Sequence, residues 1–148
     1  MQKQLRIGAL AGALAIAGFL AGCSSGPMSG MMHSGQQVSL SGSNEVPAVM
    51  TSASGSGTVT IHSDRTVSAK IMATGMTPTA AHIHEAMAGT NGPVIVPLNK
   101  MGDNEFVAPE GAKLTESQYE SYKAGKLYVN VHSAKNPGGE IRAQIKGN

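Results

Sequence analysis

Residues 67–73 read Val-Ser-Ala-Lys-Ile-Met-Ala, and every second side chain from Val67 onward is apolar. Successive side chains of a β-strand point to opposite faces, so this alternation predicts a strand with one buried and one exposed face. The same period of two recurs at Val38/Leu40, Val59/Ile61, Ala81/Ile83, Leu127/Val129/Val131 and Ile141/Ala143/Ile145. About seven short antiparallel strands are therefore expected.

Segments rich in Gly, Pro, Asn and Ser separate these strands, as turns do. We interpret residues 136–139, Asn-Pro-Gly-Gly, as a turn rather than a binding loop, because they are the residue types that a turn requires. Strands at this spacing predict an all-β sandwich or Greek-key barrel.

One short helix is expected near residues 114–124, where Thr115 can cap it, Gln118 stands at its third position and Gly125 can end it. It would be a connector at one end of the sandwich.

The N-terminus has the order of a secretory signal: Lys3 and Arg6, an apolar run over residues 7–20, then Leu20-Ala21-Gly22-Cys23. The run is shorter than the ~20 residues of a membrane-spanning helix. The tetrapeptide resembles the bacterial lipobox, which implies cleavage after residue 22 and acylation, palmitate included, at Cys23. An ordinary signal with an incidental cysteine is the alternative. Cys23 is the only cysteine and can form no internal disulfide, which favours the lipid anchor.

The chain thus divides into a signal peptide at 1–22, a lipidated and flexible methionine-rich tether at 23–35, and a folded domain at 36–148. By resemblance to lipoproteins of bacteria with two membranes, Ser24 after the cysteine favours the outer membrane. We expect a cell-envelope protein that is anchored to membrane lipid through Cys23 and faces the periplasm or the cell surface.

Composition argues against several functions. Loss of Lys3 and Arg6 with the signal leaves nine basic and nine acidic residues, without the basic stripe that nucleic-acid binding requires. Three tyrosines, two phenylalanines and no tryptophan offer no aromatic platform for sugars or bases. No serine stands in a nucleophile elbow, so an ordinary hydrolase is not expected.

Five ordered motifs closely resemble the chordin-type (CHRD) domain over residues 36–146: 40–47 (LSGSNEVP), 55–57 (GSG), 80–94 (AAHIH followed by GTNGPV), 127–132 (LYVNVH) and 136–142 (NPGGEIR). The resemblance implies an immunoglobulin-like barrel and leaves the function open. In addition, residues 81–85 (AHIHE) are similar to the His-x-His-Glu strand of copper-zinc superoxide dismutases. The chain has no cysteine pair and no recognisable remaining ligand set of that family.

Three histidines are candidate metal ligands. His82 and His84 lie two residues apart on a predicted strand and share its polar face. His132 has the same placement on its own strand, so all three meet if the two strands are neighbours. Neutral imidazoles suit copper and zinc. Glu140 and Glu85 are possible fourth ligands or hydrogen-bond acceptors for an imidazole. The alternative is that the histidines only hydrogen-bond to neighbouring strands and loops.

The tether adds Met28, Met31, Met32 and His33, three thioethers and an imidazole within six residues. Thioethers favour Cu(I), although methionines also serve as adaptable packing. The leading hypothesis is a membrane-anchored copper-binding module. A protein-interaction or matrix module without metal, and copper-dependent redox activity of the dismutase type, remain as alternatives.

Overall fold

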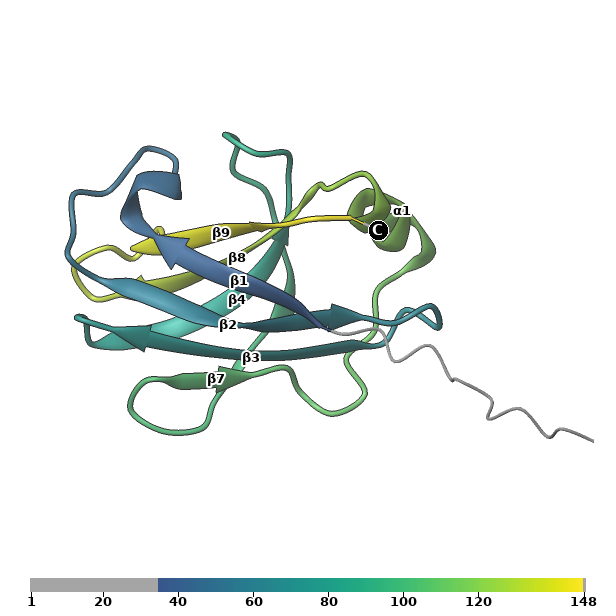
Figure 1. Ribbon diagram of the computed structural model, residues 1–148, viewed down its shortest axis with the longest axis horizontal. Helices are drawn as coiled ribbons and strands as arrows, with labels where there is room; N and C mark the ends of the chain where they lie inside the picture. The colour runs from purple at the N-terminus through teal and green to yellow at the C-terminus, as the bar shows by residue number, and fades with distance from the viewer. Residues whose placement is uncertain (1–34, 148) are drawn as a thin grey trace, which may run out of the picture. The chain divides into compact units, whose positions relative to one another are not determined.

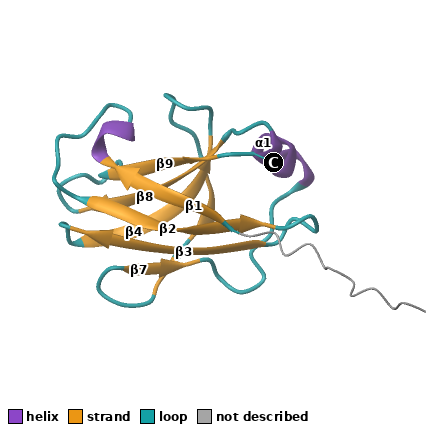
Figure 2. Ribbon diagram, viewed as in Figure 1, coloured by secondary structure: helices purple, strands orange, loops and turns teal. Residues whose placement is uncertain are grey.

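The computed structural model describes residues 35–147. The predicted signal peptide, Cys23 and the tether residues Met28, Met31, Met32 and His33 lie outside the described residues. The described part is an antiparallel β-structure with one short α-helix (Figures 1 and 2). Its strands are β1 (Gln36–Ser41), β2 (Ser54–Ile61), β3 (Val67–Thr74), β4 (Pro78–Glu85), β5 (Val94–Pro97), β6 (Asn99–Lys100), β7 (Glu105–Val107), β8 (Leu127–Ser133) and β9 (Ile141–Ile145).

The alternation of apolar residues places the core as predicted. Along β3 buried and exposed residues alternate without exception, from Val67 to Thr74. The inward side chains of the long strands form one aliphatic core, joined by Phe106 of β7. The predicted all-β sandwich or barrel with a short connecting helix is therefore confirmed.

The strands form one sheet in the order β5-β4-β8-β9-β1-β2-β3-β7-β6. Its two edge strands, β5 and β6, belong to one stretch of chain and are separated only by Leu98. On one side of Leu98 this stretch pairs with β4, and on the other side it pairs with β7. The Leu98 amide donates to the carbonyl of Ala81 at 2.9 Å. Residues 94–100 thus bring the two edges together and nearly close the sheet into a barrel.

The short helix α1 (Glu116–Lys123) has the ends that the sequence predicts. The Thr115 side chain accepts a hydrogen bond from the Gln118 amide, and the Gln118 side chain accepts one from the Thr115 amide. Gly125 follows the helix with φ +68°, a left-handed conformation that glycine adopts without strain. Among the described residues, no helix is both long and apolar enough to cross a bilayer.

Strand β8 differs from the half-buried strand expected from its alternation, because all seven of its residues are buried. One face packs on the core. The other face, with Tyr128, Asn130 and His132, lies beneath the loop between β4 and β5, the segment around the 3₁₀ turn η1 (Gly42–Asn44) and the turn before β9. In Figure 1 η1 and the β4–β5 loop stand above β9. A buried polar layer therefore lies between the barrel wall and these loops.

Candidate metal centre

Strands β4 and β8 are antiparallel neighbours, as convergence of the predicted histidines requires. His82 pairs with Asn130, and Ala80 pairs with His132, so His82 and His132 lie diagonally across the two strands. His84 follows two residues after His82 and shares its face. The intervening Ala81 and Ile83 point into the core. All three histidines therefore stand on the outer face of the barrel wall.

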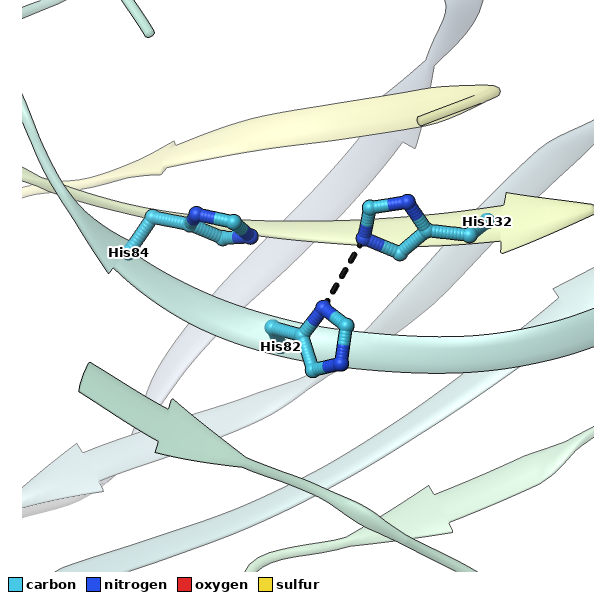
Figure 3. Close-up of side chains that lie close together, drawn as sticks. All are labelled: His82, His84 and His132. Atoms are coloured by element: carbon cyan, nitrogen blue, oxygen red, sulfur yellow. Dashed lines mark hydrogen bonds between the residues drawn. The ribbon is translucent and has the colours of Figure 1, made fainter. Parts of the chain in front are cut away.

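The imidazole nitrogens converge on one point (Figure 3). His82 Nδ1 lies 3.0 Å from His132 Nε2. One nitrogen from each ring lies within 4.8 Å of the other two. Two ligands bound at 2.0–2.1 Å to a single zinc ion are at most about 4.2 Å apart. Small movements of the rings are sufficient to bring all three nitrogens to one ion.

Backbone carbonyls fix the proton positions on two of the rings. His84 Nδ1 lies 2.9 Å from the carbonyl oxygen of Gly92, and His132 Nδ1 lies 2.9 Å from that of Pro137. A carbonyl oxygen only accepts, so each Nδ1 carries a hydrogen and donates it. The Nε2 atoms of His84 and His132 consequently hold lone pairs, which is the state in which an imidazole binds a metal.

His84 Nε2 is buried and has no hydrogen-bond partner among the described residues. Leaving a buried acceptor unpaired costs about 1–3 kcal/mol. His132 Nε2, in contrast, accepts from His82 Nδ1 when that nitrogen is protonated. A cation in place of the proton on His82 Nδ1 would be a partner for the Nε2 atoms of both His84 and His132. The residues present therefore fit a metal ion.

Burial keeps the rings of His82 and His84 neutral. It is the main cause that lowers the pKa of His82 to about 4, and the neighbouring His132 and His84 add to the effect. Burial also lowers the pKa of His84, against the opposing effects of the Gly92 carbonyl and the Asn130 side chain. At pH 7 protons therefore do not compete for the nitrogens of His82 and His84. His82 is only partly buried, so the cluster is open to solvent on its side.

A stack of side chains supports His84 from the neighbouring strands. Its ring lies parallel to that of Tyr128, with 4.7 Å between centroids. The guanidinium of Arg142, on β9, lies 3.3 Å from the centroid of the Tyr128 ring. Arg142 also donates to Asn91 Oδ1 and to the Thr90 carbonyl, at 3.1 and 2.7 Å. The stack ties the β4–β5 loop, which supplies the Gly92 carbonyl, to the barrel wall.

A buried carboxyl lies beside this layer. Glu45, just after η1, is 6% exposed, and burial raises its pKa against the lowering effects of Arg142 and Asn130. A Cβ on Gly139 would lie 2.5 Å from Glu45 Oε1 and 2.6 Å from Asn130 Nδ2, and Oε1 has no hydrogen-bond partner among the described residues. Glycine at this position therefore allows the turn before β9 to approach both side chains.

The predicted accessory residues lie elsewhere or outside the described residues. Glu140 accepts hydrogen bonds from the hydroxyls of Thr51 and Ser133. Glu85 accepts one from Ser121, on α1, at 2.6 Å. Within residues 35–147, the group of close His, Cys, Asp and Glu donors around His82 contains only the three histidines. The structure thus brings together the predicted triad but not Glu140 or Glu85.

Sequence reasoning did not anticipate Arg142, Glu45 or the Gly92 carbonyl as parts of the site. Arg142 occupies an outward position between Ile141 and Ala143, where a strand normally exposes a charge to solvent. Its burial depends on loops that are distant in sequence. No local pattern in this single sequence carries that signal, although Asn91-Gly92-Pro93 is readable as a turn.

Comparison with known proteins gives one family. The model of the CHRD domain family matches residues 36–145. Neither the curated proteins nor the solved structures yield a match. The matched residues span all nine strands and the three histidines. This chain belongs to the CHRD domain family.

Proposed function

We propose that this protein is a lipid-anchored copper-binding module of the bacterial cell envelope, in which His82, His84 and His132 hold the ion. One observation carries the proposal: three imidazoles converge in a cluster where His84 Nε2 is buried without a partner among residues 35–147. A histidine cluster that only stabilised the fold would be expected to pair its buried nitrogens, as most buried polar groups do.

Copper is favoured over zinc by the sequence around the domain. Imidazole suits both metals, whereas thioethers are soft ligands that suit Cu(I). Met28, Met31 and Met32, beside His33, would carry such ligands on the tether. The tether would then capture copper near the membrane and transfer it to the histidine cluster.

The anchor follows from the N-terminal sequence. The lipobox-like residues 20–23 would attach Cys23 to membrane lipid, and Ser24 favours the outer membrane. More than one acyl chain makes such anchoring stable, since a single chain binds a membrane only marginally.

Metal titration of the protein expressed from Ser24 onward tests the proposal. Cu(II), Cu(I) and Zn(II) are added separately, and binding is followed by calorimetry and by competition with a chelator of known affinity. We expect one Cu(II) ion per chain at the histidine cluster and tighter binding of Cu(II) than of Zn(II), while the tether contributes only to Cu(I) binding. The triple variant His82→Ala, His84→Ala, His132→Ala should lose this binding, with folding checked by circular dichroism.

His62 provides the matched control. It lies outside the cluster, at the end of β2, so the variant His62→Ala should bind copper as the unmodified chain does. Should the triple variant remain folded and bind Cu(II) with unchanged affinity, or should the unmodified chain bind no Cu(II), the proposal is wrong.

A further inference from the structure

Asn130 stands at the base of the histidine cluster and is 1% exposed. It lies opposite His82 in the β4–β8 register and two residues before His132 on its own strand. Its side chain therefore leaves the same face of the sheet as all three histidines. No other asparagine among the described residues is buried on a strand.

The two polar atoms of the Asn130 amide, Nδ2 and Oδ1, have different surroundings. Nδ2 lies on the side of Gly139 and Glu45, and the Asn130 side chain opposes the burial that raises the pKa of the Glu45 carboxyl. Because the oxygen and nitrogen of an amide point in different directions, Oδ1 faces away from that carboxyl. Oδ1 is buried and has no hydrogen-bond partner among the described residues.

Besides Glu45 Oε1, two buried acceptors are thus left unpaired among the described residues, His84 Nε2 and Asn130 Oδ1. Two lone pairs cannot satisfy each other, and each buried acceptor without a partner costs about 1–3 kcal/mol. A cation is a single partner for both. Three imidazole nitrogens and one oxygen form the N,O donor set that suits tetragonal Cu(II).

We infer that Asn130 Oδ1 is a fourth ligand of the ion held by the three histidines, and that Glu45 orients the Asn130 amide for this purpose. The inference rests on the proposed function and specifies the coordination of the same site. Because an amide is neutral, the site would keep the full charge of the bound ion.

Pulsed electron paramagnetic resonance of the unmodified chain tests this directly. The protein expressed from Ser24 onward is labelled with ¹³C-asparagine and loaded with one equivalent of Cu(II). We expect couplings from imidazole nitrogens together with a ¹³C coupling from a bound asparagine. Imidazole couplings without the ¹³C coupling would overturn the assignment of Asn130 alone. Absence of the imidazole couplings would overturn the proposed function, and this inference with it.

Affinity gives a second measurement. Asn130→Leu keeps the approximate volume of the side chain and removes the oxygen, so its Kd for Cu(II) should rise about ten- to hundredfold. Asn104→Leu is the matched control, because Asn104 is exposed. Its Kd should not change. An unchanged Kd in folded Asn130→Leu also contradicts the inference, and if that variant does not fold, the resonance experiment decides.

Discussion

At the scale of single residues, Arg142 has the largest side chain among those that are almost completely buried. Its guanidinium stacks on Tyr128 and donates to two acceptors of the β4–β5 loop. A planar group with a fixed fork of donors makes these contacts together, whereas the compact ammonium of lysine does not.

We therefore predict that Arg142→Lys lowers the free energy of unfolding by about 2 kcal/mol although it keeps the charge. Urea denaturation followed by circular dichroism measures the change. Arg65→Lys serves as control, because Arg65 lies in the turn between β2 and β3, outside the polar layer. Equal stabilities of the two variants would show that the stack contributes little.

The neutral histidines make stability depend on pH. The pKa of His82 is about 4 in the folded chain, against an ordinary value of 6.5, so between these values the unfolded chain binds more protons. The free energy of unfolding should therefore fall as the pH is lowered from about 6.5 to about 4. The lowered pKa of His84 acts in the same direction. The raised pKa of Glu45 acts in the opposite direction, since it favours the folded state in acid.

Comparison of variants isolates the contribution of His82. His82→Gln cannot titrate, so its loss of stability between pH 7 and pH 4, measured by urea denaturation without metal, should be smaller than that of the unmodified chain. His62→Gln should behave like the unmodified chain. The same loss in all three proteins would contradict the prediction.

At the scale of elements, the turn before β9 distinguishes two adjacent glycines. The Gly139 amide donates to the Asn136 carbonyl at 3.1 Å, which confirms the predicted turn. Gly139 has φ +129°, and a Cβ there would lie 2.5 Å from Glu45 Oε1. A Cβ on Gly138 would meet no atom within 4 Å.

Gly139→Ala should therefore lower the free energy of unfolding by about 2 kcal/mol, while Gly138→Ala should change it by less than about 0.5 kcal/mol. Because Gly139 also contacts Asn130, the Gly139→Ala variant should bind copper more weakly as well. Thermal denaturation and copper titration of both variants test this. Similar effects of the two substitutions would show that the close approach at Gly139 is unimportant.

Elements that carry a long alternating pattern could be predicted from the sequence, and those without one could not. β3 has eight residues and a strict period of two, whereas β6 has two residues and β7 has three, too few to show a period. The alternation of β4 and β8 also placed the three histidines on polar faces. It could not show that loops cover these faces, and for this reason the roles of Arg142 and Glu45 were missed.

At the scale of the whole described domain, closure of the barrel depends on residues 94–100. Leu98 is 8% exposed and lies where this segment passes from β4 to β7. Leu98→Ala should lower the free energy of unfolding by about 3 kcal/mol, because truncation of a buried leucine to alanine generally costs about 2–5 kcal/mol. Val94→Ala, at a position that is 46% exposed, should lower it by less than about 1 kcal/mol. Urea denaturation of both variants provides the comparison, and a loss in Leu98→Ala no larger than in Val94→Ala would contradict this role of the segment.

The position of the histidines outside the barrel has a kinetic consequence. A ligand enclosed in a packed core exchanges only after local or global opening of the structure. His82, His84 and His132 lie between the wall and its loops, and His82 is partly open to solvent. An ion held there could enter and leave without separation of the strands, so its exchange would be limited by breaking of the metal–ligand bonds and not by unfolding. Transfer to a competing chelator would then be complete long before the amide hydrogens of β8 exchange with solvent.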